Sequence, residues 1–152
     1  MSVASRIKDV SHVSIAVSDM DRSIAFYRDV LGWQQLFDEH MEGESFDAIT
    51  GVQGAAGRAC GGRIGSLRVE LMCFNYIPAT PPGPGLGLRV LSLEVDEAGA
   101  AHAELVARGV PVAGPPVEVH GTRMFFVLDP DGQGIEMCEY VPGGPAWGGA
   151  YA

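Results

Sequence analysis

The sequence predicts an α+β fold made of two tandem βαβββ modules within one domain of 152 residues. One observation is a repeat: an alternating strand, a helical segment and further strands occur in order, and the same order restarts after the middle of the chain. A second is the stretch 78–87, which is too rich in Pro and Gly to continue a sheet and suits a semi-rigid connector. The alternating apolar positions of the two leading strands lie 78 residues apart: Val13, Ile15 and Val17 in one, Leu91, Leu93 and Val95 in the other.

The first module opens with segment 9–17, which reads as a strand with one apolar face and one polar face. A helix is predicted next, because apolar residues then recur at near-helical spacing. Ser18 or Asp19 can serve as its N-cap and Gly32 as its C-terminal stop. Strand therefore passes directly into helix.

Three further strands are expected in the first module over 33–74, separated by a polar, Gly-rich middle, with the clearest alternation at 67–74. The second module is predicted to repeat this order of elements, with a helix at 98–108, a strand at 123–128 and a last strand at 134–140. The turn DPDG joins these last two strands.

The predicted boundaries place the first module at 8–77, the connector at 78–87, the second module at 88–142 and a Gly-rich tail at 143–152. Trp147 and Tyr151 of the tail are expected either to fold over a cleft or a partner subunit, or to be loosely ordered.

Composition excludes several classes of function. Ten Lys and Arg against 19 Asp and Glu leave a formal charge of −9, so the chain lacks the basic surplus that binds nucleic acid or anionic membranes. No stretch has about 18 consecutive apolar residues, which argues against a transmembrane helix. Three cysteines without zinc-ribbon or CxxC spacing, and an N-terminus without the apolar run of a signal peptide, predict a cytoplasmic protein.

Strand parity predicts where chemistry can occur. His12 lies on the polar face of the first strand, and Glu70 lies opposite the apolar row of the strand that closes the first module. Glu136 holds the corresponding place in the last strand. If each module forms a curved sheet whose apolar face is covered by its helix, these three side chains line a cleft. Nitrogen and oxygen ligands of this kind suit Zn, Ni, Co, Mn or Fe, and solvated strand residues are the alternative.

Other side chains near these strands are candidates for substrate contact. Arg68 and Arg123 are expected to flank the cleft, where each can meet a carboxylate or phosphate, although exposed strand arginines are common. Cys138 shares parity with Glu136 and is expected to line the cleft as a small apolar group. His120 precedes the penultimate strand and is a candidate acid, base or metal ligand, or else a surface-loop histidine.

Three parts of the sequence together resemble the vicinal oxygen chelate superfamily, which includes glyoxalase I, methylmalonyl-CoA epimerase, extradiol dioxygenases, fosfomycin-modifying enzymes and bleomycin-type resistance proteins. They are DVSHVSIAVSDMDRSIAFYRDVLGW, then VELMCF, then LSLEVDE with FFVLDPDGQGIEMCEY. The resemblance covers about residues 8–142 and does not select a member.

The resemblance implies paired modules that form a U-shaped metal cleft, often completed in a homodimer. The metal ligands of the family come from the first and last strands of each module. Here those positions hold His12 and Glu70 in the first module, and Val90 and Glu136 in the second. Val90 cannot ligate a metal and is instead a candidate for substrate contact, so the pattern departs from four-ligand glyoxalases and from two-histidine dioxygenases.

The leading hypothesis is therefore a divalent-metal-dependent lyase, isomerase or epimerase that acts on a small carbonyl compound by proton abstraction. His12, Glu70 and Glu136 would hold the metal, and Glu70 or Glu136 would act as the base. The alternative is a metal-free protein that sequesters an antibiotic or another small aromatic or cationic ligand in the same cleft. A dioxygenase ranks third.

Overall fold

The computed structural model describes residues 3–78 and 90–141. The chain divides into two compact units, Met1–Ala79 and Thr80–Ala152. The division falls within the predicted connector, most of which lies outside the described residues, as does the tail with Trp147 and Tyr151. Each unit contains a four-stranded mixed sheet and helix, so the predicted α+β fold of two tandem modules is confirmed.

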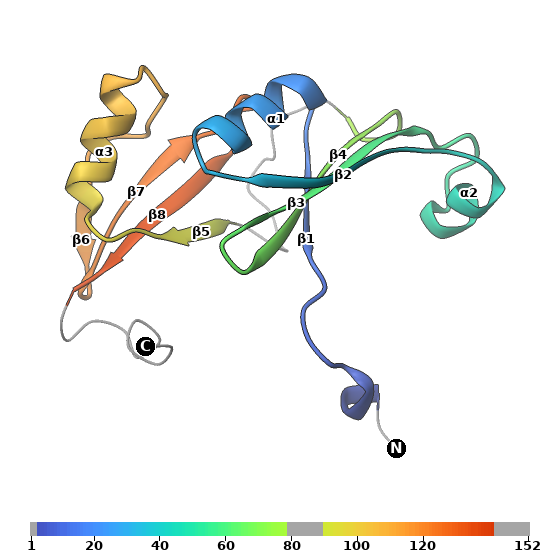
Figure 1. Cartoon of the computed structure of the whole chain (residues 1–152), viewed down its shortest axis with the longest axis horizontal. Helices are drawn as coiled ribbons and strands as arrows, with labels where there is room; N and C mark the ends of the chain where they lie inside the picture. Colours follow the sequence, from blue (N-terminus) through green and yellow to red (C-terminus); the bar gives the residue numbers. More distant parts are fainter. Residues whose placement is uncertain (1–2, 79–89, 142–152) are drawn as a thin grey trace. The chain divides into compact units, whose positions relative to one another are not determined.

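The sheet of the first unit has the strand order β1-β4-β3-β2 (Figure 1). Strand β1 runs parallel to β4, and the other pairs are antiparallel. In chain order, the elements are η1 (Val3–Arg6), β1 (Val13–Ala16), α1 (Met20–Asp29), β2 (Gln34–Met41), α2 (Glu44–Thr50), β3 (Gly57–Ile64) and β4 (Leu67–Phe74). The last strand has the bounds predicted from its alternation.

Helix α1 begins and ends where the sequence predicts. The Asp19 side chain accepts a hydrogen bond from the Arg22 backbone N–H and so caps the helix. At the other end Gly32 adopts a φ of +70°, and the Trp33 N–H reaches back to the Tyr27 carbonyl. One face of the helix packs against the apolar face of the sheet, and its buried residues are Met20, Ser23, Ile24 and Tyr27.

Helix α2 is absent from the sequence prediction, which treats this region as a polar, Gly-rich middle. The helix is seven residues long and buries none of them, so it has no apolar periodicity to detect. Tertiary contacts hold it instead: the Asp47 carboxylate accepts hydrogen bonds from the backbone N–H groups of Gly54 and Ala55. The first module is thus a βαβββ unit with one inserted helix.

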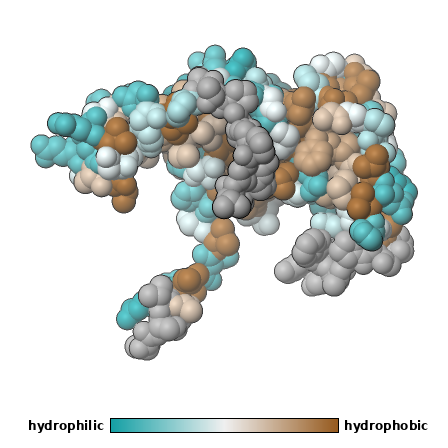
Figure 2. Space-filling view, turned by 180° about the vertical axis from the view of Figure 1, so that it is seen from behind, coloured by the Kyte–Doolittle hydropathy of each residue, from teal (hydrophilic) through white to brown (hydrophobic). Residues whose placement is uncertain are grey.

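The N-terminal segment leads away from the sheet of its own unit (Figure 1). Ile7 and Val10 on this segment are largely exposed, and Figure 2 shows apolar side chains along it. Exposed apolar residues are common on folded proteins, so this feature alone defines no site.

The sheet of the second unit has the order β5-β8-β7-β6, with β5 parallel to β8. An α-helix follows β5, as α1 follows β1. The elements are β5 (Leu91–Glu94), α3 (Ala98–Ala107), β6 (Val117–Val119), β7 (Thr122–Leu128) and β8 (Gly134–Tyr140). In the described residues no helix is long and apolar enough to cross a membrane.

Strand parity matches the prediction in both units. Val69 and Leu71 of β4 are buried on the helix side, whereas Glu70 lies on the other face. In β8, Ile135 and Met137 are buried on the side of α3. The apolar rows therefore form two cores, and the opposite faces carry the polar candidates.

Candidate functional site

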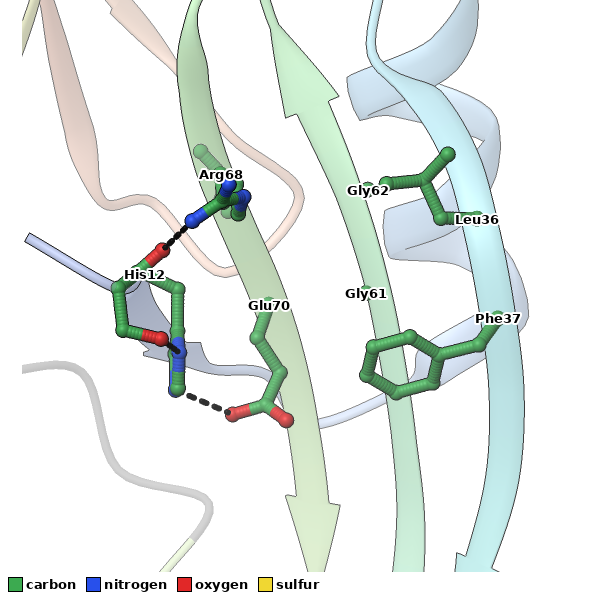
Figure 3. Close-up of a pocket in the computed structure, with 9 residues that line it drawn as sticks. His12, Leu36, Phe37, Gly61, Gly62, Arg68 and Glu70 are labelled. Atoms are coloured by element: carbon green, nitrogen blue, oxygen red, sulfur yellow. Dashed lines mark hydrogen bonds and ion pairs between the residues drawn. The ribbon is translucent and has the colours of Figure 1, made fainter.

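A pocket of about 320 Å³ lies on the polar face of the first unit's sheet (Figure 3). His12, just before β1, and Glu70 on β4 line one side of it. Phe37 on β2 lines the other side, and Gly61 on β3 forms the floor between them. The complete lining consists of Ser11, His12, Leu36, Phe37, Gly61, Gly62, Arg68, Val69 and Glu70.

His12 and Glu70 come together as the parity argument expects. Nε2 of His12 lies 3.7 Å from Oε2 of Glu70. About half of the imidazole is exposed and Glu70 is mostly covered, with side-chain exposures of 48% and 17%. The Ser11 hydroxyl lies 3.0 Å from Nδ1, the other ring nitrogen. Figure 3 shows His12 with Nε2 turned toward the Glu70 carboxylate.

Ser14 fixes the Glu70 carboxylate from the neighbouring strand. The two residues are directly opposite in the parallel pairing of β1 with β4, and the Ser14 hydroxyl donates to Oε2 at 2.7 Å. Oε1 has no hydrogen-bond or ion-pair partner among residues 3–78 and 90–141. One oxygen is thus held in place and the other is available to a ligand or proton.

The His12–Glu70 pair fits two ligands of a divalent metal ion. Ligand atoms about 2.1 Å from one ion at a tetrahedral angle lie about 3.4 Å apart, close to the 3.7 Å observed. One nitrogen and one carboxylate oxygen are also the donor types that Zn and similar ions accept. The described parts of the chain contain no group of three or more His, Cys, Asp or Glu side chains placed to hold a metal. Two protein ligands are therefore the most that the described residues of the first unit supply.

The aromatic wall depends on a glycine. Phe37, Gly61 and Glu70 occupy one row across β2, β3 and β4. A Cβ atom at Gly61 would stand 2.0 Å from the Phe37 ring, so any side chain there would displace the ring (Figure 3). The missing side chain makes room both for the ring and for the pocket beside Glu70.

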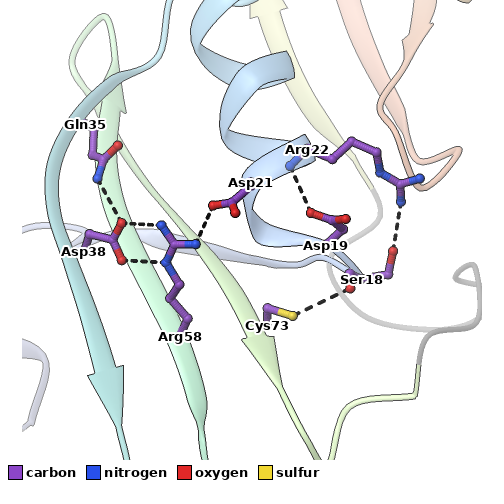
Figure 4. A network of polar contacts seen from close by, with 8 residues as sticks. All are labelled: Ser18, Asp19, Asp21, Arg22, Gln35, Asp38, Arg58 and Cys73. Atoms are coloured by element: carbon purple, nitrogen blue, oxygen red, sulfur yellow. Dashed lines mark hydrogen bonds and ion pairs between the residues drawn. The ribbon is translucent and has the colours of Figure 1, made fainter.

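A network of charged groups joins β2, which carries Phe37, to the rest of the unit (Figure 4). The Arg58 guanidinium on β3 makes two hydrogen bonds to Asp38 on β2 and one to Asp21 on α1. These hydrogen bonds hold the pKa of Asp38 at about 2, below its ordinary 3.8. Burial, and then the neighbouring Asp38 carboxylate, raise the pKa of the Cys60 thiol to about 12.

The second unit repeats the serine–glutamate pair without the histidine. Ser92 lies directly opposite Glu136 in the pairing of β5 with β8, and its hydroxyl donates to Oε2 of Glu136. Cys138 interacts with Glu136, and burial and then the Glu136 carboxylate raise the pKa of its thiol to about 12. Val90, the residue before β5, stands at the position equivalent to His12 and is partly exposed.

Arg123 lies on the face of β7 opposite to the one that carries Glu136. It is paired with Glu139 in the β7–β8 register, whereas Glu136 is paired with Phe126, and an odd offset of three positions puts the two pairs on opposite faces. The Arg123 guanidinium bonds to Glu139, which also accepts a hydrogen bond from the Ala98 N–H at the start of α3. Within the second unit Arg123 is therefore part of the contact between sheet and helix, whereas the sequence led us to expect it beside the cleft.

His120 occupies the tip of the β6–β7 hairpin. It and Gly121 both have positive φ, 48° and 76°, as a two-residue type I′ turn requires. Its side chain is exposed. The structure accounts for His120 as a turn residue, and it belongs to no group of three or more metal-ligating side chains among the described residues.

Sequence reasoning overlooked one functional candidate, Arg63. It lies directly opposite Arg68 in the β3–β4 pairing and on the same face as Gly61 and Glu70. The dipeptide Gly65-Ser66 could have revealed this pairing in the sequence. A two-residue hairpin turn that begins with Gly places Arg63 opposite Arg68.

The comparisons with known proteins agree with this architecture. A family model described as "Glyoxalase/Bleomycin resistance protein/Dioxygenase superfamily" matches residues 9–137, so the chain belongs to that superfamily. The resemblance seen in the sequence is thereby confirmed.

Individual relatives point in different functional directions. Lactoylglutathione lyase of Haemophilus influenzae is 31% identical over 133 residues, which are 86% of this chain and 91% of that protein. The crystal structure of TnmS3, an antibiotic binding protein from Streptomyces sp. CB03234, has a TM-score of 0.63 at 29% identity, covering 88% of this chain and 97% of that one. A glyoxalase family protein from Bacillus cereus has a TM-score of 0.74 at 22% identity, covering 89% and 95%, and shows the shared fold.

Proposed function

We propose that the protein is a divalent-metal-dependent lyase or isomerase that abstracts a proton next to the carbonyl group of a small molecule. The observation that carries the proposal is the approach of His12 Nε2 to Glu70 Oε2, 3.7 Å apart at the edge of a pocket with an aromatic wall. The similarity to lactoylglutathione lyase supports the lyase class.

In this proposal His12 and Glu70 hold the metal, and Glu136 is a further candidate ligand because, within its own unit, it repeats the position and the serine bond of Glu70. A bound divalent ion polarises a substrate carbonyl and so acidifies the proton on the adjacent carbon. Ser14 keeps Oε2 of Glu70 in place, which leaves Oε1 as the atom that accepts this proton. Phe37 orients an apolar part of the substrate and keeps water from one side of it.

The proposal further places the protein in the cytoplasm as a homodimer that takes a small molecule as substrate. An edge strand with exposed apolar residues supports the dimer: all but the last residue of β2 are exposed, including Leu36 and Phe37. Light scattering is expected to give about twice the mass of one 16.0 kDa chain. A single-chain mass would contradict the dimer.

Metal content is the first test. Protein purified without chelator or affinity-tag metal is expected to contain about one divalent ion per chain by elemental analysis. His12→Ala is expected to lose it, whereas His40→Ala, which changes an exposed histidine of β2 that faces Glu42, is expected to retain it. No metal after soaking in Zn, Ni, Mn and Fe salts would overturn the proposal.

Proton abstraction is tested separately. Small 2-hydroxy and 2-oxo carbonyl compounds are incubated with the metal-loaded protein in D₂O, and loss of the adjacent proton signal is followed by NMR. Glu70→Gln is expected to slow exchange by at least about a hundredfold, in the range that general-base catalysis contributes. Exchange that is equally fast in wild type and variant would exclude Glu70 as the base.

A second candidate is a metal-free binding protein that sequesters a small aromatic or cationic molecule. Val90 favours it, because the second unit lacks the imidazole that the first has at the same position. The similarity to the antibiotic binding protein TnmS3 supports it too. This function predicts ligand binding that is unchanged by EDTA and by His12→Ala.

A further inference from the structure

Two arginines lie side by side on the face that carries the pocket. Arg63 and Arg68 are directly opposite each other in the antiparallel pairing of β3 with β4. Such residues have Cβ atoms about 5 Å apart, and the hydrogen bonds of the two guanidinium groups lead to opposite sides, from Arg68 toward β1 and from Arg63 toward β2. Arg68 itself lines the pocket, and it donates to the carbonyl of Ser11, the residue before His12.

Neither arginine is neutralised by the protein in the part of the chain that the structure describes. Arg68 contacts only a backbone carbonyl there, and Arg63 donates only to the side-chain amide of Gln34. Arg28, Arg58, Arg108 and Arg123, by contrast, all have carboxylate partners. An unpaired pair of guanidinium groups is unexpected in a chain with a net charge of −9, where carboxylates outnumber cations.

On this face the two arginines and Glu70 occupy adjacent rows of side chains. Glu70 lies two residues beyond Arg68 on β4, which places the arginine row roughly 7 Å from the carboxylate row at 3.3–3.4 Å per residue. The Phe37 ring stands in the carboxylate row. An anionic group is therefore attracted to one end of the pocket and repelled from the other.

We infer that Arg63 and Arg68 form a subsite for an anionic oxygen group, and that the substrate is a carbonyl compound that also carries a carboxylate or phosphate. The substrate class rests on the proposed function, whereas the anion subsite does not. The Phe37 ring in the pocket wall favours a ligand whose apolar part packs against it.

Matched small probes test the subsite. Benzoate, phenyl phosphate and neutral benzamide are titrated into the isotope-labelled full chain, with EDTA present, and amide shifts are followed by NMR. At least one of the two anions is expected to bind about tenfold more tightly than benzamide, as charge-assisted hydrogen bonds would produce. The stronger of the two identifies the group as carboxylate or phosphate.

Variants assign the preference to the two arginines. Arg63→Gln and Arg68→Gln are each expected to weaken anion binding about three- to tenfold and to leave benzamide unchanged. Arg28→Gln, which alters an exposed arginine of α1, is the control and is expected to bind like the wild type. Equal binding of anions and benzamide, or a preference that persists in the double variant, would overturn the inference.

The same experiment keeps the two proposals distinct. Because the titration contains EDTA, an anion preference that depends on the arginines stands even if no metal binds. A preference that appears only after Zn²⁺ is added and persists in the arginine variants would contradict the subsite and support the metal. Loss of Zn²⁺ binding in His12→Ala with intact anion preference would leave both proposals standing.

Discussion

The two modules share a strand register but differ in the side chains placed on it. Both carry a serine hydrogen-bonded to a glutamate across a parallel strand pair, Ser14 with Glu70 and Ser92 with Glu136. The position across from the glutamate on its antiparallel neighbour is Gly61 in the first module and Phe126 in the second.

This difference bears on the pocket of the first module. The absent side chain at Gly61 leaves space between Glu70 and the ring of Phe37, whereas the second module has the Phe126 side chain at the corresponding position, with its ring against Gly134. The two modules therefore have the same strand pairing but different side chains at this position. Both contain the serine that holds the glutamate carboxylate, whereas the pocket described above is lined by residues of the first module alone.

The largest expected effect is a loss of folding stability when alanine replaces a glycine that packs against an aromatic ring. In Gly62→Ala the new Cβ would lie 2.2 Å from the ring of Trp33, which is fully buried and donates to the Val69 carbonyl. Such overpacking should destabilise the protein by about 3 kcal/mol. Urea unfolding measures the loss.

Two further glycine-to-alanine variants give smaller expected losses of stability for comparison with Gly62→Ala. In Gly61→Ala the partly exposed Phe37 ring can swing away, so a smaller loss is expected, together with a changed pocket. In Gly134→Ala of the second module the nearest ring atom is 3.0 Å away, and the expected cost is about 1 kcal/mol or less. If all three variants cost the same, the modules do not differ in the way proposed.

Restoring the missing imidazole tests the second module. Val90→His places a histidine two residues before Ser92, as His12 stands two residues before Ser14. If Glu136 is a metal ligand, Zn²⁺ affinity measured by competition with a chromophoric chelator should rise about tenfold or more. Val119→His, at an exposed position of β6, is the control. Unchanged affinity in Val90→His would remove Glu136 from the ligand set.

The folding stability that Asp38 contributes in the first module is expected to depend on pH. Because hydrogen bonds from Arg58 lower the pKa of Asp38 from 3.8 to about 2, the folded state binds this proton less readily than the unfolded state. The resulting stabilisation is present above about pH 4 and is lost as the pH falls toward 2. The stability difference between wild type and Asp38→Asn should therefore shrink across this range. A constant difference would show that the ion pair does not affect stability.

The smallest expected effect is a difference in the rate at which the three cysteine thiols are alkylated. Cys60 in the first unit and Cys138 in the second are buried, and burial with a nearby carboxylate raises the pKa of each to about 12. Cys73 is only partly buried. At pH 8 iodoacetamide should therefore modify Cys73 first, as mass spectrometry of the digested protein can establish. Faster labelling of Cys138 would indicate that its strand opens readily.

Much of the fold was predictable because period-2 alternation is local. Segments 67–74 and 134–140 have the predicted bounds, and the cap at Asp19 lies where expected. Helix α2 escaped prediction because it buries no face, so nothing in its apolar pattern distinguishes it from a loop.

The candidate site was predictable in part for the same reason. Parity places His12 and Glu70 on one face without knowledge of their partners. Arg123 was expected to flank the cleft, but it alternates with the buried Phe125 and Val127 and pairs with Glu139 across β7 and β8. His120 owes its place to a hairpin turn whose backbone needs positive φ.

The sequence by itself determined the duplication, the strand-then-helix start of each module, and which face of the strands 67–74 and 134–140 points away from the core. These properties depend on neighbours within a few positions along the chain. Only the tertiary structure decided that His12 approaches Glu70, that Arg63 faces Arg68, and that Gly61 leaves room for an aromatic ring. Such contacts depend on register between strands distant in sequence, which turns, bulges and packing set together.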